Sequence, residues 1–266
     1  MISNMQALRS ILLPALLLGG SVAQADTGSD WLAKLTAPPK TLADAQAQCG
    51  ENAPHPWTWD KFSDQIQAAS DKLETAARAK MSDPKYQQEL AEKSMAASMD
   101  PQSAMAQMQY AQYISGLGTS SPDVTGEKLF DPLYEKAQAD AAAAVKANNA
   151  KISKCPKVPG GEDGPYPAPF CQKPIDADSA VKKNAVANQY LASVAKAWPG
   201  HLKDAQDYFK KINVVPDGVD PSNMNVQIQR DNIPMQELGS VKKMSELSEK
   251  ACQNAVEIAN LYVSGG

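Results

Sequence analysis

The sequence predicts an all-α protein that folds as a helical bundle of six to seven helices. Apolar residues recur at helical spacing through most of the chain, and Asp-Pro pairs begin three of the expected helices. The alternating pattern of a strand is found at one place, with no visible partner strand. The prediction includes a Pro/Gly-rich loop closed by a disulfide and one long irregular connection before the last helix.

The first long helix is expected to begin near residue 58. Its apolar positions step by three and four residues, which is the seam of a helix packed along a neighbour: Trp59, Phe62, Ile66, Ala69, Leu73 and Ala76. The next three helices begin at Asp83-Pro84, Asp100-Pro101 and Asp131-Pro132, because aspartate caps a helix well and proline fits its first turn. The helix after Asp131 is alanine-rich, and its small side chains favour close packing.

The C-terminal part of the chain is expected to hold three more helices. Two are predicted at 181–198 and 202–212, with Pro199 as the break between them. The last begins near Ser240. The proline-containing stretch 213–239 before it is predicted to be an irregular connection, with one short extended segment at 224–228.

Residues 1–25 have the features of a cleaved secretory signal peptide. A basic Arg9 precedes an apolar run at 11–20, and Ala-Gln-Ala at 23–25 is a small-residue cleavage site. That run is far shorter than the roughly 20 residues needed to cross a bilayer, which disfavours an anchor. We expect a periplasmic or secreted chain with no later transmembrane segment. Residues 26–266 are predicted to be a single helical domain, with the 155–175 loop as the alternative boundary between two helical halves.

The four cysteines are predicted to form two structural disulfides. Export places them where disulfides persist, and none lies in a C-x-x-C motif or at metal-ligand spacing from a histidine. The segment between Cys155 and Cys171 holds five prolines and three glycines, so it is expected to form neither helix nor regular sheet. Such a segment needs a constraint from outside itself to hold its shape, and a bond across its two ends is the simplest one. We therefore pair Cys155 with Cys171, which leaves Cys49 with Cys252.

Composition and motifs exclude several classes of function. Removing the signal peptide takes the net charge from −4 to −5, which disfavours binding to nucleic acid. The chain lacks a nucleophile elbow, a phosphate-binding loop and a dinucleotide fingerprint. Its two histidines, His55 and His201, have no ligand partners at metal-binding spacing. The sequence therefore predicts a protein that is not an enzyme and needs no cofactor, unless catalytic residues converge only in three dimensions.

Four aromatic residues are candidates for contact with a partner. Trp57 and Trp59 precede the first long helix and would anchor a partner if they are exposed; the alternative is that Trp57 staples the helix start while Trp59 packs in the core. Tyr166 and Phe170 lie in the Pro/Gly-rich loop, which is either a rigid recognition loop or a stapled connector.

Methionines gather in the helices on either side of Asp100. Met95 and Met99 are one helical turn apart, and Met105 and Met108 share a face of the next helix. Thioether sulfur suits Cu(I), whereas methionine that packs a core or contacts a partner needs no special geometry. We therefore predict an exported helical protein that binds a protein or other cell-envelope partner, as an adaptor, inhibitor or immunity-type factor. Cu(I) binding by these four residues is the alternative.

Overall fold

The structure of the protein is a computed structural model that describes residues 27–51, 53, 58–119, 123, 126–160, 164–221 and 223–262. The expected signal peptide and the expected mature start at Asp26 lie outside these residues. Most of the described residues are helical and the strands are two residues long, which confirms the all-α class. In chain order the elements are α1 (Gly28–Lys34), α2 (Leu42–Cys49), α3 (Thr58–Ser82), α4 (Pro84–Met99), α5 (Pro101–Thr119), α6 (Asp131–Ile152), β1 (Lys157–Val158), β2 (Tyr166–Pro167), α7 (Pro169–Ile212), α8 (Met224–Asp231) and α9 (Ile233–Asn260).

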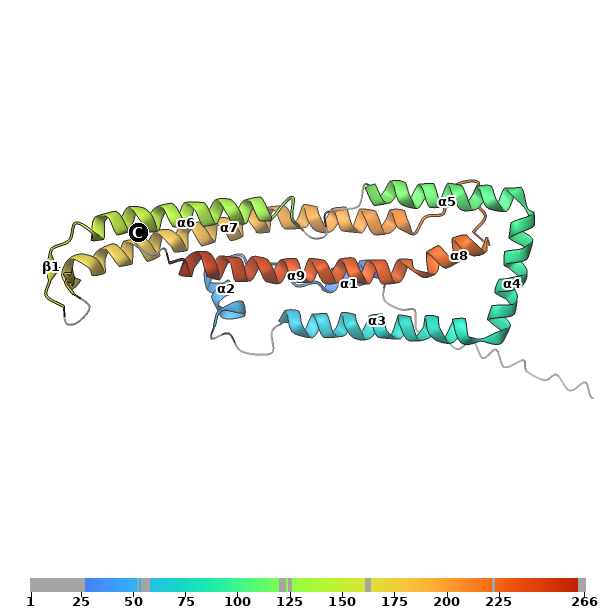
Figure 1. Cartoon of the computed structure of the whole chain (residues 1–266), viewed down its shortest axis with the longest axis horizontal. Helices are drawn as coiled ribbons and strands as arrows, with labels where there is room; N and C mark the ends of the chain where they lie inside the picture. Colours follow the sequence, from blue (N-terminus) through green and yellow to red (C-terminus); the bar gives the residue numbers. More distant parts are fainter. Residues whose placement is uncertain are drawn as a thin grey trace, which may run out of the picture.

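The molecule is elongated, with α7 and α9 side by side at its centre (Figure 1). α6 and the first half of α7 form a long hairpin, and the turn that carries β1 and β2 lies at one end of the molecule. α3 packs on α9 from the other side. α4 crosses between α3 and α5 at the opposite end of the molecule. Among the described helices, none is both long and apolar enough to span a lipid bilayer.

The main core lies where α6, α7 and α9 meet. It is built largely from small and medium side chains, so the helices can approach closely. On α6 the residues Ala137, Ala141 and Asn148 are buried, and α9 is buried along one face from Val241 to Ile258. α3 begins as predicted, with Trp59, Phe62 and Ile66 in the core, but the seam ends near Leu73 and the rest of α3 is exposed.

Two short helices that the apolar spacing did not predict, α1 and α2, pack on both α7 and α9. At the start of α1, the buried Glu237 of α9 accepts hydrogen bonds from the Gly28 backbone N–H (2.8 Å) and from Asn213 Nδ2 (2.6 Å). A Cβ on residue 28 would lie 2.5 Å from the Cβ of Glu237, so this contact requires glycine. A carboxylate at a helix N-terminus is also favoured by the helix dipole.

The Asp-Pro pairs work as predicted at two of the three helix starts. Asp83 accepts a hydrogen bond from the Lys85 backbone N–H, and Asp100 accepts two, from the backbone N–H groups of Gln102 and Ser103. At the third, Phe130 is the N-cap of α6 and makes no side-chain cap. Asp131 is instead the first residue of the helix, and it accepts a hydrogen bond from Lys250 on α9.

Pro199 does not break the chain into two helices, contrary to the prediction. α7 is continuous from Pro169 to Ile212, with Pro174 and Pro199 inside it. A proline removes one hydrogen bond from a helix and crowds the preceding turn, but packing on both sides can hold the helix together. Trp198 and His201 are both buried beside Pro199. Tertiary contacts therefore outweigh the local cost.

The connection before the last helix is shorter than predicted. Residues 224–231 form helix α8 and not an extended segment, and α9 already begins at Ile233. Val226 is fully buried against Tyr110 and Val219 in a second, smaller core. Pro234 lies in the first turn of α9, where the missing N–H costs nothing. The described residues therefore form more helices than the six to seven expected. α1, α2 and α8 are added, although two of the expected helices are joined in α7.

Candidate functional site

The disulfide-closed loop lies at the free end of the α6–α7 hairpin (Figure 1). Cys155 and Cys171 are bonded as predicted, with their Cα atoms 5.8 Å apart. The expectation that this segment has no regular structure is wrong, because β1 and β2 pair antiparallel, with Lys157 opposite Pro167, and α7 already begins at Pro169. The disulfide holds the two ends of the segment together, so even a proline-rich segment can form a short two-stranded sheet.

This loop presents two of the predicted aromatic candidates to solvent. Tyr166 is 50% exposed and Phe170 is 75% exposed. Between them Ala168 is fully buried, and its backbone N–H donates to the Pro156 carbonyl at 2.7 Å. The disulfide, the two-stranded ladder and this hydrogen bond hold the aromatic pair in a defined position.

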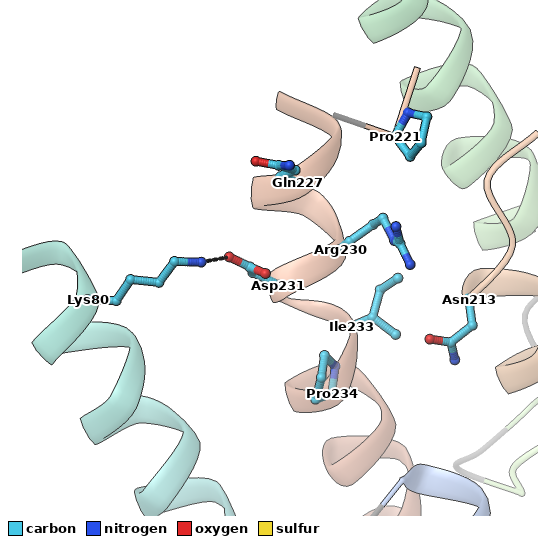
Figure 2. A pocket seen from close by; sticks show the side chains of 8 residues that line it. All are labelled: Lys80, Asn213, Pro221, Gln227, Arg230, Asp231, Ile233 and Pro234. Atoms are coloured by element: carbon cyan, nitrogen blue, oxygen red, sulfur yellow. Dashed lines mark hydrogen bonds and ion pairs between the residues drawn. The ribbon is translucent and has the colours of Figure 1, made fainter. Parts of the chain in front are cut away.

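A polar pocket of about 440 Å³ lies between the end of α3 and the junction of α8 with α9 (Figure 2). Lys80 Nζ on α3 is 2.5 Å from Asp231 Oδ2 on α8, and this hydrogen bond raises the pKa of Lys80. Arg230 also lines the pocket, which gives one unbalanced positive charge but no nucleophile with an adjacent base. The residues that line this pocket come from distant parts of the chain, so no local sequence motif could have predicted it.

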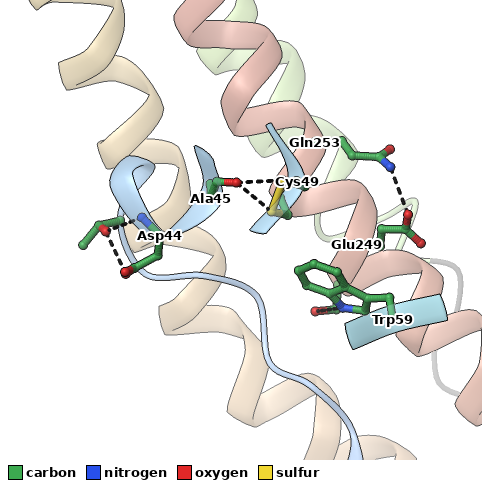
Figure 3. Close-up of a disulfide and its surroundings, with 9 residues drawn as sticks. Asp44, Ala45, Cys49, Trp59, Glu249 and Gln253 are labelled. Carbon is green, nitrogen blue, oxygen red and sulfur yellow. Dashed lines mark hydrogen bonds between the residues drawn. A yellow bond between two sulfur atoms is a disulfide. The ribbon is translucent and has the colours of Figure 1, made fainter. Parts of the chain in front are cut away.

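Trp59 is not an exposed anchor, and this candidate is corrected. It is 1% exposed, because the first turn of α3 packs on α9 near the bond between Cys49 and Cys252 (Figure 3). Its indole N–H donates to Ser248 Oγ at 3.1 Å, and Ser248 in turn donates to the Thr36 carbonyl. The core position that the helical seam predicts is therefore the correct one. Trp57 lies outside the described residues.

Three of the four candidate methionines on α4 and α5 have described side chains, and all three are at the surface. Met95 is 67% exposed, Met105 is 58% exposed and Met108 is 56% exposed, while the side chain of Met99 lies outside the described residues. α4 and α5 run in different directions, with α4 across the end of the molecule and α5 along it. Within the described part of the chain, no group of three His, Cys, Asp or Glu side chains could hold a metal ion. Cu(I) binding by the thioethers stays a prediction.

His201 is a buried histidine packed among aromatic rings. Its ring lies edge-on to Phe130, with centroids 5.4 Å apart, and beside Trp198. Its Nε2 makes no hydrogen bond among the described residues. Burial lowers the pKa of His201, although Asp123 and Asp204 oppose this shift electrostatically. Packing among apolar and aromatic groups therefore favours the neutral imidazole. His55 lies outside the described residues.

We expect His201 to make the protein less stable in mild acid. Above its ordinary pKa of 6.5 the imidazole is neutral in both the folded and the unfolded protein. Below it the unfolded chain takes up a proton that the folded chain refuses, so the free energy of unfolding falls until the lower folded pKa is passed. Urea unfolding between pH 7 and about 5, above most carboxyl titrations, measures this loss. His201→Phe should flatten the profile, and an unchanged slope in that variant would contradict the assignment.

Comparison with known proteins identifies no relative: no family model, no curated protein and no solved structure matches the chain.

Proposed function

We propose that this chain is an exported, non-enzymatic protein of the cell envelope that binds another protein through its disulfide-closed loop. The observation that carries the proposal is the exposure of Tyr166 and Phe170 at the free end of the α6–α7 hairpin. An adaptor, an inhibitor and an immunity-type factor would all use such a surface. The absence of catalytic motifs from the sequence supports a binding role over an enzymatic one.

The loop has the physical properties of a protein-binding surface. Phenylalanine and tyrosine supply a large contact area with few rotatable bonds, and aromatic residues are enriched at the centres of protein interfaces. Because the bond between Cys155 and Cys171 and the pairing of β1 with β2 restrain Tyr166 and Phe170, these side chains lose little conformational entropy when a partner binds. A solvent-exposed Phe170 gains apolar burial only in a complex.

Export is supported by the chemistry of the cysteines as well as by the features of residues 1–25. All four cysteines form disulfides, and no free thiol remains. Disulfides form and persist in oxidising compartments. We therefore propose the cell envelope, or the space outside it, as the place where the partner is met.

Photo-cross-linking from position 170 tests the proposal. The full chain, expressed with its own first 25 residues and a photoreactive phenylalanine at position 170, should enter the exported fraction and form one defined adduct with an envelope protein. Wild-type protein should compete for that adduct, whereas Phe170→Ala should compete about thirtyfold less well, as expected when a hot-spot aromatic is lost.

The matched control is Tyr262, an aromatic residue that is 84% exposed outside the loop. The same photoreactive residue at position 262 should give no such adduct, and Tyr262→Ala should compete as well as wild type. Failure to form an adduct from position 170, or identical adducts from both positions, would contradict the proposed function.

A further inference from the structure

The methionines of helices α3 to α5 expose their side chains to solvent, although methionine is a residue type that proteins usually bury. Met81, near the end of α3, is 53% exposed. Met95 on α4 and Met105 and Met108 on α5 are exposed to a similar degree. We call these four residues the surface methionines. Met244 of α9, by contrast, is fully buried in the main core.

The surface methionines contribute little to the packing of the fold. Neither hydrophobic core contains any of them, and α5 packs instead through Tyr110, which is buried against Val219 and Val226. They are spread over three helices, of which α4 runs across the end of the molecule and α5 along it (Figure 1). Reaction with a small molecule requires only exposure of each sulfur atom, whereas docking to one partner requires a shared surface.

Other easily oxidised side chains are withdrawn from solvent in the part of the chain that the structure describes. All four cysteines form disulfides, so no thiolate competes for an oxidant. The described tryptophans, Trp31, Trp59 and Trp198, are all buried. Thioether sulfur is polarizable and is oxidised readily where it is accessible. The surface methionines are therefore the groups that an oxidant in solution meets first.

We propose that the surface methionines scavenge hypohalous acids and so protect the rest of the chain from oxidation. In each reaction hypochlorous acid gives its oxygen atom to Sδ: an S–O bond forms, the O–Cl bond breaks, and chloride and a proton are released. The thioether is oxidised by two electrons to the sulfoxide while the chlorine is reduced to chloride. Methionine sulfoxide is the reversible step of sulfur oxidation, because sulfoxide reductases restore the thioether.

The exposed position of these residues decides what their oxidation does to the fold. A sulfoxide is polar, and on an exposed side chain water solvates its oxygen. On Met244 the same oxygen would lie within the hydrophobic core, at a cost in folding free energy. Burial also restricts access, because an oxidant reaches Met244 only when the core opens. The surface methionines therefore consume oxidant while the helices stay packed.

Peptide mass spectrometry of the intact, disulfide-bonded protein tests the order of reaction during stepwise addition of hypochlorous acid. Up to about four equivalents, one for each surface methionine, oxygen should accumulate on these residues, and Met244 should react roughly tenfold more slowly. The near-ultraviolet circular dichroism, which reports tertiary packing, should stay unchanged. Oxidation of Met244 in parallel with the surface methionines, or loss of that signal when only the surface methionines carry oxygen, would overturn the proposal.

Replacing all four surface methionines with leucine tests the protection itself. At the same dose this variant should carry several times more oxidation on Met244 and the tryptophans than wild type does. Val181→Leu, at an apolar site of α7 that is 68% exposed, is the matched control and should behave as wild type. A leucine variant with no more damage than wild type would overturn the proposal.

Two further measurements separate this inference from a folding defect and from the proposed function. Val181→Met, added to the leucine variant, should take up oxygen and lower the oxidation of Met244, because exposure determines which sulfur reacts; no uptake at position 181 would contradict this. The leucine variant should cross-link from position 170 as wild type does. Neither oxidation experiment needs a binding partner, so a failed cross-link would reject the proposed function and leave this inference standing.

Discussion

Replacing Cys49 and Cys252 together with alanine should lower the free energy of unfolding by about 5 kcal/mol. The bond closes a chain segment of 203 residues, and the entropy that such a closure removes from the unfolded chain grows with its length. Both residues are buried, so the folded protein also loses the packing of two sulfur atoms. The loss should appear first in α1 and α2, because this bond is their covalent attachment to α9.

Chemical denaturation without reductant measures this effect, with Cys155→Ala/Cys171→Ala as the matched control. The control removes a bond across a sequence separation of 16 residues, and the same chain-entropy relation gives about 3 kcal/mol. Hydrogen exchange should show protection lost in residues 27–51 for the first variant and near the hairpin turn for the second. Equal losses from the two variants would show that closing the longer segment contributes no additional stability.

Trp59→Ala should cost about 3–5 kcal/mol of unfolding free energy, the range for removing a fully buried large aromatic side chain. The substitution leaves a cavity between α3 and α9. It also removes the N–H that donates to Ser248, a residue that itself holds the Thr36 carbonyl. We therefore expect both α3 and the segment after α1 to loosen.

Trp59→Phe separates the two contributions in the same denaturation experiment. It keeps much of the ring but not the N–H, so the part of its loss due to the hydrogen bond should be about 1 kcal/mol. Val181→Ala, on an exposed face of α7, should change the stability by less than about 0.5 kcal/mol. If Trp59→Ala lowers the free energy of unfolding no more than this control does, Trp59 does not anchor α3 to the core.

The elements that were predicted correctly are those whose signals are local. The spacing of Trp59, Phe62 and Ile66 places one face of α3 in the core wherever the partner helix lies. The caps at Asp83 and Asp100 use backbone groups only two or three residues away. The pairing of Cys155 with Cys171 followed from a proline-rich segment that needs closure, and it determined the other pair.

The elements that were missed depend on contacts between distant parts of the chain. α1 and α2 have seven and eight residues, too few to be stable alone, and they exist because they pack on α7 and α9. α7 runs through Pro199 because packing outweighs a lost hydrogen bond. The candidate sites divide in the same way: Tyr166 and Phe170 were found from the loop composition, but the burial of Trp59 was one of two readings that sequence left open.

The sequence by itself determined the helical class, the starts of α3 to α6, the disulfide pairing and the aromatic loop, because each depends on residues close together in the chain or on the chemistry of four cysteines. Only the tertiary structure decided that the disulfide-closed loop lies at one end of the molecule and that Trp59 is buried. The physical reason is that exposure and juxtaposition are set by which helices pack together, and helical periodicity alone does not specify the partner of each face.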